Sequence, residues 1–395
     1  TLIDCLSNSD KIYFYWNKPS EQTTILGIDA FEIITGNGTE RTLLTENLVH
    51  PLKESFINNW SDFNLKNVPL FLGGMKFAPN DESQLWADYD DSDWFIPKVL
   101  LFKQNDNFYF ISNFYYSNEN LEAIKHRIIL SYEAICAMKT SNTNSFVPDS
   151  FNYGSDEELE QWTAKVNNAL ENITKGCIQK IVLSRRVHVK FSSVSSISKW
   201  LEILSGKFPK CYIFAYRKNE SLFFGATPEK LAKISNGIIE ADALAGSTPR
   251  GIDEDEDLLL EAELLKSAKN RAEQKAVVDF IAKSFSEFAE NVEFDKTPKI
   301  RKLKNIQHLW TPITAKLKEK NSLFSILKII HPTPAICGVP WTEALSSIKT
   351  MEDHSRGLFS GIIGWFNFEN EGEFGVAIRS AIIKGKDLYA FAGCG

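Results

Sequence analysis

Short apolar and aromatic runs, separated by polar turns, make up the first 150 residues of the chain. Residues 11–16, 99–102 and 107–112 are three such runs, and the stretches between them contain Asn, Asp and Gly. Runs of this length between turn residues are typical of β-strands. We therefore expect this part of the chain to form strands and turns, and it carries little information about chemistry.

A polar connection follows at residues 141–153, where Ser, Asn and Pro are frequent and large apolar residues are few. This composition is typical of an exposed loop. We place the main boundary of the chain there. It separates a strand-rich amino-terminal part, residues 1–150, from a second part, residues 151–395.

A helix and then a strand are predicted directly after this connection. Ser155 and Glu158 form a capping-box pattern and Gly176 follows the last turn, which together predict a helix over 156–175. Residues 179–191 alternate between apolar and polar side chains, and this period of two predicts a strand. Its core face carries Ile181, Leu183, Val187, Val189 and Phe191, with Arg185 as the exception, and its other face carries Lys180, Ser184, Arg186, His188 and Lys190.

The remaining elements follow from the same periods and from turn residues. The pattern predicts a helix at 197–204, a hairpin of strands at 211–217 and 221–225, a strand ending at Asp242, helices at 255–266, 269–289, 322–330 and 342–351, and a final hairpin that ends at Gly395. Thr227 and Pro228 are a favourable N-cap and first helical residue, so Glu229 is expected in the first turn of a helix. Residues 244–251 are mainly small and are expected to form a loop.

A proline-rich segment, residues 331–340, follows the predicted helix at 322–330. Its three prolines fix φ and remove backbone donors, so it fits neither a helix nor a central strand. A rigid loop beside small residues suits a site where a ligand approaches the backbone, but such a loop can also be purely structural. Spacing alone leaves both interpretations open.

The composition is that of a globular protein with enough apolar residues for a large core. The chain has 395 residues, of which 43% are hydrophobic, which suffices for one large domain or two ordinary ones. No apolar run approaches the roughly 20 residues that span a bilayer, and residues 1–10 lack the basic and apolar regions of an export signal. We therefore expect a cytoplasmic protein without a membrane partner.

Charge and cysteine usage argue against further classes. The net charge is -7 and no stretch clusters Lys and Arg, so we expect no nucleic-acid partner. The six cysteines are scattered, without a Cys-x-x-Cys pair or a His at ligand spacing, so neither a zinc site nor a disulfide framework is predicted. An anionic small substrate is compatible with this composition where positive groups converge locally.

The carboxyl-terminal half carries a set of motifs in a fixed order. They are His331-Pro332-Thr333-Pro334-Ala335, Gly338-Val339-Pro340, Glu352, Arg356-Gly357, Gly361, Gly364-Trp365, Ala377-Ile378-Arg379 and Ala392-Gly393-Cys394-Gly395. In this order they resemble the signature of the chorismate-utilising enzymes, in particular of their isochorismate synthase branch. The match covers this half of the chain almost without interruption.

This resemblance implies an α+β fold, the large sandwich of the anthranilate synthase component I type with two interlocked halves. It also implies an isomerase that converts chorismate to isochorismate with Mg²⁺, as a monomer without a glutaminase subunit. The alternatives are salicylate, aminodeoxychorismate and anthranilate synthases, which tend to carry Thr or Ser at the position of Ala335, and a non-catalytic homologue. Ala335 favours the isochorismate branch, and the sequence does not fix whether the product enters menaquinone or siderophore synthesis.

A carboxylate lies on the expected core stripe of the helix at 269–289. The positions three, four, seven and eight residues after Glu273 are Ala276, Val277, Phe280 and Ile281, which places Glu273 on the apolar face. A charged carboxylate there needs a partner, either a neighbouring Lys or Arg or a metal. In the family, a Glu in the Lys-Asn-Arg-x-Glu context binds magnesium, so the resemblance assigns Glu273 to Mg²⁺.

Lys180 and Glu229 are the candidate catalytic residues. Lys180 lies on a polar strand face, where a lysine is usually solvated, but residues 180–185 match a family motif whose lysine is the general base, which requires a neutral amine. Glu229 matches the general acid of a Gly-x-(Ser/Thr)-Pro-Glu motif, whose pKa must be raised by apolar surroundings, whereas a helix N-terminus would stabilise the anion. We expect both groups to face one cavity, on opposite sides of a single ring.

The remaining candidates are substrate-binding residues. Arg379 can hold a carboxylate through two parallel hydrogen bonds, although a surface ion pair explains an arginine there equally well. The family uses this arginine and the backbone of the Ala-Gly-x-Gly turn for a substrate carboxylate, which points to Arg379 and Gly393. The resemblance adds Gly246 and Ser247 through their backbone amides, His308 beside the substrate ring, and Ala335 in the proline-rich loop. A plain turn is the alternative for the first two, and a structural histidine is the alternative for His308.

The family continues past the Ala-Gly-x-Gly motif with a helix that carries a second glutamate ligand for magnesium. The sequence starts at Thr1 and stops at Gly395. We therefore expect that helix to lie beyond Gly395, and Glu273 to form only part of the metal site.

Overall fold

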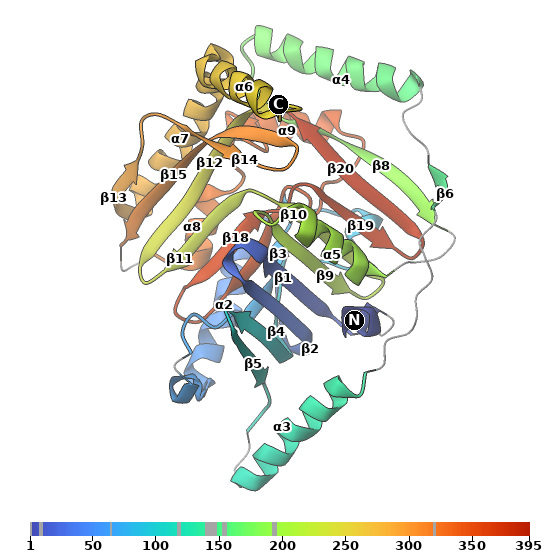
Figure 1. The fold of residues 1–395 in the computed structure, drawn as a ribbon, viewed down its shortest axis with the longest axis vertical. Coiled ribbons are helices and arrows are strands. Elements are labelled where there is room, and N and C mark those ends of the chain that lie inside the picture. The colour runs from blue at the N-terminus through green and yellow to red at the C-terminus, as the bar shows by residue number, and fades with distance from the viewer. Residues whose placement is uncertain are drawn as a thin grey trace.

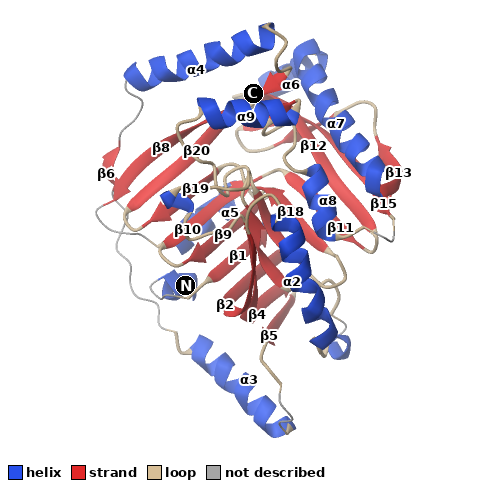
Figure 2. Cartoon of the chain, turned by 180° about the vertical axis from the view of Figure 1, so that it is seen from behind, coloured by secondary structure: helices blue, strands red, loops and turns tan. Residues whose placement is uncertain are grey.

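Long antiparallel strands form the centre of the molecule, and helices lie on its outer faces (Figures 1 and 2). The computed structural model describes residues 2–7, 11–63, 65–116, 120–138, 148–151, 156–191, 196–318 and 321–395. The helices are α1 (Leu2–Ser7), α2 (Arg41–Ser55), α3 (Leu121–Cys136), α4 (Asp156–Thr174), α5 (Ile197–Lys207), α6 (Glu254–Lys266), α7 (Ala268–Phe288), α8 (Leu323–Ile330) and α9 (Trp341–Met351). The strands are β1 (Tyr13–Lys18), β2 (Thr23–Gly36), β3 (Phe71–Met75), β4 (Ser92–Gln104), β5 (Asn107–Ser112), β6 (Pro148–Phe151), β7 (Lys180–Ile181), β8 (Leu183–Phe191), β9 (Tyr212–Lys218), β10 (Ser221–Thr227), β11 (Lys230–Ser235), β12 (Ile238–Pro249), β13 (Ala289–Phe294), β14 (Lys299–Lys302), β15 (Ile306–Leu317), β16 (Gly338–Val339), β17 (Ile362–Phe366), β18 (Gly372–Val376), β19 (Ser380–Lys384) and β20 (Asp387–Cys394).

One series of antiparallel pairings links strands from distant parts of the chain. Its first arm runs in the order β5, β4, β2, β1, β9, β10, β19, β20, β8 and β6. Its second arm starts at the long strand β4 and continues through β3, β17, β18, β11, β12 and β15, and β15 also pairs with β13 and β14. Because β1 pairs with β9 and β3 pairs with β17, strands from both sides of the 141–153 connection share one sheet.

Helices α2, α7 and α8 cover one face of this sheet, as seen from behind in Figure 2. The apolar stripe of α7, which includes Val277, Ile281 and Phe285, packs against Ile313 of β15 in one core cluster. A second cluster is rich in aromatic rings from β1, β4, β9 and β10. Together the helical layer and the antiparallel strands confirm the expected α+β class.

Most predicted helices and strands form within two residues of their expected bounds. The helix expected at 197–204 extends to Lys207, and the strand expected at 99–102 begins at Ser92. Other differences lie near the candidate site. The expected loop at 244–251 is largely part of β12, because it pairs with β15 as far as Pro249. No helix starts at Thr227, because β11 begins at Lys230 and pairs with β18. The expected connection at 141–153 lies outside the described residues except for β6.

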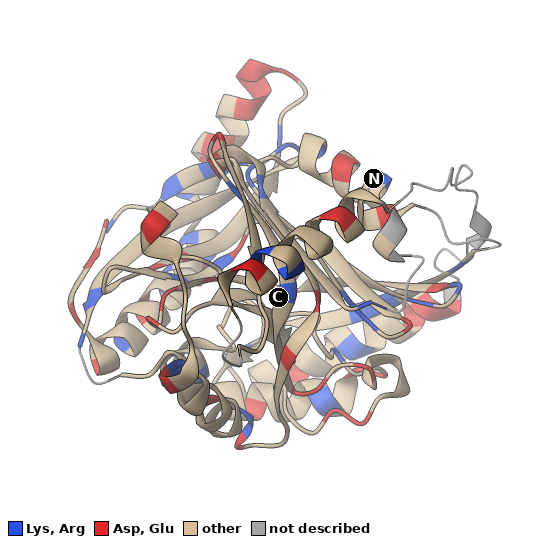
Figure 3. Ribbon diagram, turned by 90° about the horizontal axis from the view of Figure 1, so that it is seen from below, with Lys and Arg blue, Asp and Glu red and all other residues tan. Residues whose placement is uncertain are grey.

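Lys and Arg positions alternate with Asp and Glu positions along the ribbon in the view of Figure 3, without a large region of one sign. This distribution agrees with the absence of a Lys and Arg cluster in the sequence. Within the described ranges, none of the helices has the length and apolar character needed to cross a membrane.

Candidate active site

Lys180 lies in a short strand that the proline-rich loop holds in place. Strand β7 pairs with β16, so that Lys180 lies opposite Val339. The backbone N–H of Gln179 donates to the Val339 carbonyl at 2.7 Å, and the N–H of Val182 donates to the Cys337 carbonyl at 2.8 Å. Gly338 permits this approach, because a Cβ atom there would lie 2.2 Å from the Lys180 carbonyl oxygen.

The Lys180 ammonium group contacts the carboxylate of Glu273, with Nζ 3.0 Å from Oε1. Both side chains are partly buried, at 18% and 28% exposure. The structure corrects the expected position of Glu273 on α7. The buried stripe of the helix contains Gln274, Val277, Val278 and Ile281, so Glu273 lies at the edge of the stripe and reaches sideways to Lys180.

Gln274 is a polar side chain on the buried stripe of α7. Its Nε2 donates to the Ala243 carbonyl at 3.0 Å and to Thr311 Oγ1 at 3.1 Å, and its Oε1 accepts from the backbone N–H of Ala245 at 2.9 Å. These bonds connect α7 to β12 directly before Gly246. The sequence pattern did not identify Gln274, because the apolar stripe of the helix was centred on Glu273. A stripe that starts at Gln274 includes it.

Glu229 lies between β10 and β11, and two segments fix its backbone. Its N–H donates to Thr227 Oγ1 at 3.2 Å, which is the hydrogen bond expected of a helix cap although no helix follows. The Thr227 hydroxyl donates to the Val376 carbonyl at 2.6 Å, and the Val376 N–H donates to the Glu229 carbonyl at 3.0 Å. The end of β18 therefore fixes the backbone position of Glu229.

The electrostatic environment of Glu229 favours the protonated carboxyl group. Burial raises its pKa from 4.5 to about 7, and the charge of Asp242 acts in the same direction. The charges of Lys180 and Arg379 lower this pKa, which requires both cations to lie near the carboxyl group. The raised pKa is the property that a general acid needs, and no helix starts at Thr227 that would stabilise the anion, because β11 follows.

His308 connects Ser247 to Arg379 through hydrogen bonds at both ring nitrogens. Its Nδ1 lies 2.7 Å from Ser247 Oγ, and its Nε2 lies 3.2 Å from an Arg379 terminal nitrogen. Burial lowers the pKa of His308 to about 4, so the ring is neutral at pH 7. Because a guanidinium group only donates, Nε2 must be the acceptor and Nδ1 must carry the proton that is donated to Ser247.

Arg379 adopts a backbone conformation that is uncommon for a residue with a side chain. It lies between β18 and β19 with φ of 53°, and the backbone N–H of Ala226 donates to its carbonyl at 3.2 Å. Residues held in this region of φ cluster at functional sites. Arg379 retains an exposed surface, but partial desolvation of the guanidinium group lowers its pKa, and its charge reaches both Glu229 and His308.

Gly246 forms a β-bulge in the middle of β12. The pairing of β12 with β15 shifts register between Ala245 and Ser247, and Gly246 has a φ of 75°. A Cβ atom there would lie 3.0 Å from Asn270 Cβ on α7. The bulge turns the strand so that Ser247 lies opposite His308.

Ala335 and Gly393 lie in the two backbone segments that flank β7 and β8. Ala335 is half-buried against the core, in a loop where the Thr333 carbonyl accepts from the N–H groups of Ile336 and Cys337. Gly393 belongs to strand β20 and lies opposite Ser184, so the expected turn at this motif is wrong. Pairing with β8 extends the strand to Cys394.

The structure thus gathers most of the predicted site residues. Contacts or charge effects join Lys180, Glu229, Glu273, Ser247, His308 and Arg379, whereas Gly246, Ala335 and Gly393 lie in the adjoining backbone. For a metal ion, Glu273 offers one hard oxygen donor group. The described residues contain no group of three His, Cys, Asp or Glu side chains that could hold a metal. A magnesium ion bound by one protein carboxylate together with substrate and water fits this arrangement.

Comparison with known proteins identifies relatives over the whole chain. The family model described as chorismate binding enzyme matches residues 1–395. The chain is 30% identical to the isochorismate synthase MenF of Bacillus subtilis (strain 168), over 97% of this chain and 82% of that protein. It is 30% identical to the salicylate biosynthesis isochorismate synthase of Pseudomonas aeruginosa, over 83% of this chain and 69% of that protein. The solved structure of MenF from Escherichia coli has a TM-score of 0.81 at 21% identity, covering 100% of this chain and 85% of that one, and this likeness concerns the fold.

Proposed function

The chain belongs to the family of chorismate binding enzymes, and from this premise we propose that it is an isochorismate synthase, an isomerase that converts chorismate to isochorismate. Two isochorismate synthases are among its relatives at 30% identity. The proposal rests mainly on the buried Glu229 carboxyl group. Burial raises its pKa to about 7, and the positive charges of Lys180 and Arg379 act against this rise. A carboxyl group that is protonated near neutral pH can serve as the acid of this isomerisation, and Lys180 is proposed as its base.

The two proton transfers of the reaction fall to Lys180 and Glu229. Lys180, which contacts Glu273 as an ammonium group, must first lose a proton, and the resulting amine then accepts a proton from a water molecule that attacks C2 of the ring. Glu229 donates its proton to the hydroxyl group that leaves C4, and the double bonds shift between the two carbons. One water molecule enters and one leaves, so the substrate is isomerised without a net change in composition. General acid and base groups typically contribute about 10²- to 10⁴-fold to the rate.

Arg379 is proposed to bind a substrate carboxylate, and His308 to hold Arg379 in position. The guanidinium group has a planar fork of donors that matches a carboxylate. The His308 contact uses one terminal nitrogen of Arg379 and leaves other donors for a ligand. Ser247, which accepts from the Nδ1–H group of His308, fixes the tautomer that this contact requires. Gly393, Gly246 and Ala335 are proposed to complete the substrate site through the adjoining backbone.

Glu273 is proposed to hold a magnesium ion. When bound, Mg²⁺ would hold the ring carboxylate of the substrate and offset its charge. Lys180 contacts one oxygen of this carboxylate, Oε1. We expect the substrate and water to supply further ligands.

The other family activities differ in nucleophile or in a later step. Anthranilate and aminodeoxychorismate synthases use ammonia, and salicylate synthases eliminate pyruvate. Ala335 in place of the Thr or Ser that these branches tend to carry favours water addition without elimination. We further propose a cytoplasmic monomer that acts without a glutaminase subunit.

Product analysis tests the proposed function directly. The purified protein with chorismate and Mg²⁺ should form isochorismate, which chromatography separates from chorismate, salicylate and anthranilate. The Lys180→Ala variant, which lacks the base, should form none at a measurable rate. If the wild-type protein forms salicylate and pyruvate, or needs ammonia to react, a different branch of the family is correct.

A further inference from the structure

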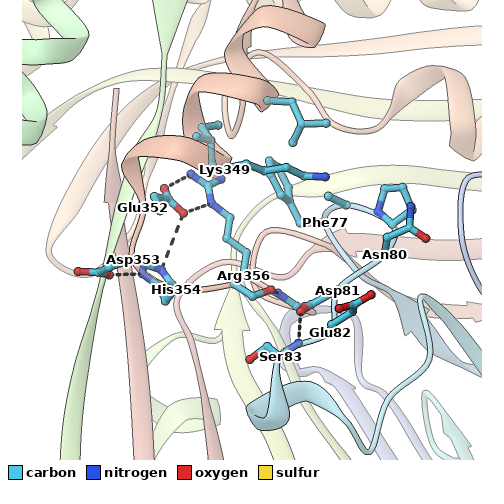
Figure 4. A pocket seen from close by; sticks show the side chains of 16 residues that line it. Phe77, Asn80, Asp81, Glu82, Ser83, Lys349, Glu352, Asp353, His354 and Arg356 are labelled. Carbon is cyan, nitrogen blue, oxygen red and sulfur yellow. Dashed lines mark hydrogen bonds and ion pairs between the residues drawn. The ribbon is translucent and has the colours of Figure 1, made fainter.

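Glu352 and Arg356 form a buried ion pair next to the strand that carries Lys180. Glu352 and Arg356 are 8% and 4% exposed. The guanidinium group meets the carboxylate through two hydrogen bonds, Nε to Oε2 at 2.9 Å and one terminal nitrogen to Oε1 at 2.6 Å. The pair lines one wall of a surface cavity of about 370 Å³ (Figure 4), and the Arg356 guanidinium lies 4.5 Å from the centre of the Phe77 ring.

In addition to contacting each other, Arg356 and Glu352 bind the backbone of two other segments. Arg356 donates to the Val182 carbonyl at 2.7 Å and to the Ile336 carbonyl at 2.8 Å. Glu352 Oε1 accepts from the backbone N–H of Ser184 at 2.6 Å. The fork of one guanidinium group therefore joins the β7–β8 connection to the proline-rich loop, and its carboxylate partner holds the first residues of β8.

Each of these backbone contacts is adjacent to a candidate site residue. Val182 is two residues after Lys180, and Ile336 directly follows Ala335. Ser184 lies opposite Gly393 in the sheet. A displacement of the ion pair would therefore move three parts of the candidate site relative to one another. These are Lys180, the loop that carries Ala335, and strand β20, which carries Gly393.

We propose that Arg356 and Glu352 are positioning residues for the isomerisation, which set the place of Lys180 relative to the loop of Ala335. The inference rests on the proposed function, because it assigns the base to Lys180. The pair touches backbone groups and does not touch the candidate catalytic side chains, so it acts through the segments it holds. A lysine cannot replace Arg356, because an ammonium group cannot form two parallel bonds to Glu352 and also reach both carbonyl groups.

The first test compares Arg356→Lys with Arg41→Lys. Arg41 is also buried, at 9% exposure, and also donates to two backbone carbonyls, those of Lys76 and Asp91, but it contacts neither the β7–β8 connection nor residues 335–338. Both variants should lower the melting temperature. Arg356→Lys should lower kcat about 100-fold, the cost of a misplacement of about 1 Å, and should change the KM for chorismate much less. Arg41→Lys should keep the wild-type kcat.

A rescue experiment separates positioning from stability. In Arg356→Ala, added guanidinium ion can reach the vacated position through the cavity, and millimolar guanidinium chloride should restore part of kcat while leaving the wild-type kcat unchanged. If Arg356→Lys does not fold, Glu352→Gln serves instead, because it keeps the side-chain volume and removes the charged acceptor, and its kcat should fall with little change in KM.

Two results would overturn the inference while leaving the proposed function intact. One is a wild-type kcat per folded molecule in Arg356→Lys together with a lowered melting temperature, because the pair would then be structural only. The other is an Arg356→Ala variant whose kcat is lowered but is not partly restored by guanidinium. Failure of the wild-type protein to convert chorismate would instead contradict the proposed function.

Discussion

Replacing Glu229 with glutamine is expected to abolish activity and to stabilise the folded protein at neutral pH. Burial raises the pKa of this carboxyl group from 4.5 to about 7, with Asp242 adding to the rise and with Lys180 and Arg379 opposing it. In the unfolded chain the group ionises at its ordinary pKa. Between these two pKa values, the folded protein holds a proton on Glu229 that the unfolded chain has lost.

The size and sign of the effect follow from this difference. One pKa unit corresponds to about 1.4 kcal/mol, so a rise from 4.5 to about 7 corresponds to about 3 kcal/mol. The contribution of a group whose pKa is raised on folding is fully present below its unfolded pKa and is lost as the pH rises through its folded pKa. Glutamine has nearly the same volume and does not titrate. The free energy of unfolding of Glu229→Gln, relative to wild type, should therefore increase by about 3 kcal/mol between about pH 4.5 and about pH 8.

Urea unfolding of both proteins near the two ends of this pH range measures the difference. An infrared difference spectrum should also contain a carboxylic-acid band in the wild-type protein near pH 6 that Glu229→Gln lacks. Turnover of chorismate by the variant should fall at least about 100-fold. A stability difference that is the same at both pH values would refute the raised pKa, and near-wild-type turnover would refute the role of Glu229 as the acid.

Three further substitutions test the remaining assignments. Ala335→Thr should shift the products towards salicylate and pyruvate, and unchanged product ratios by chromatography would count against a specificity role for this loop. Arg379→Lys should raise the KM for chorismate about 10- to 100-fold, because a charge-assisted hydrogen bond contributes about 1.5–3 kcal/mol; an unchanged KM would leave Arg379 without a role in binding. Glu273→Gln should abolish Mg²⁺-dependent turnover while circular dichroism remains that of the wild type, and a variant with the same magnesium requirement as wild type would contradict the metal assignment.

Periodicity located most helices and strands, because each element buries a face that its own sequence defines. It placed the buried stripe of α7 one residue too early, since Ala276 and Phe280 are apolar although the stripe runs through Gln274, Val277 and Ile281. Cap signals at Thr227 predicted a helix, and the hydrogen bond from the Glu229 N–H to Thr227 does form. Pairing of β11 with β18, which depends on residues about 140 positions away, decides the outcome.

The residues of the candidate site could be predicted from the sequence, but the hydrogen bonds between them could not. The resemblance supplied Lys180, Glu229, His308 and Arg379, but no local pattern brings Ser247, His308 and Arg379 into one hydrogen-bonded chain. That chain depends on the bulge at Gly246 and on the register of β12 with β15. Glu352 and Arg356 were visible as motif residues, yet their role as a buried pair depends on contacts with Val182 and Ile336 from distant segments.

The central claim is that water attacks C2 while the C4 hydroxyl group leaves, with Lys180 and Glu229 as base and acid. The most direct measurement is the reaction of the purified protein with chorismate and Mg²⁺ in oxygen-18 water, followed by mass spectrometry of the products. The account predicts isochorismate with one labelled oxygen, located in the C2 hydroxyl group, without release of pyruvate. Isochorismate without the label, salicylate with pyruvate as the main products, or unreacted chorismate would contradict it.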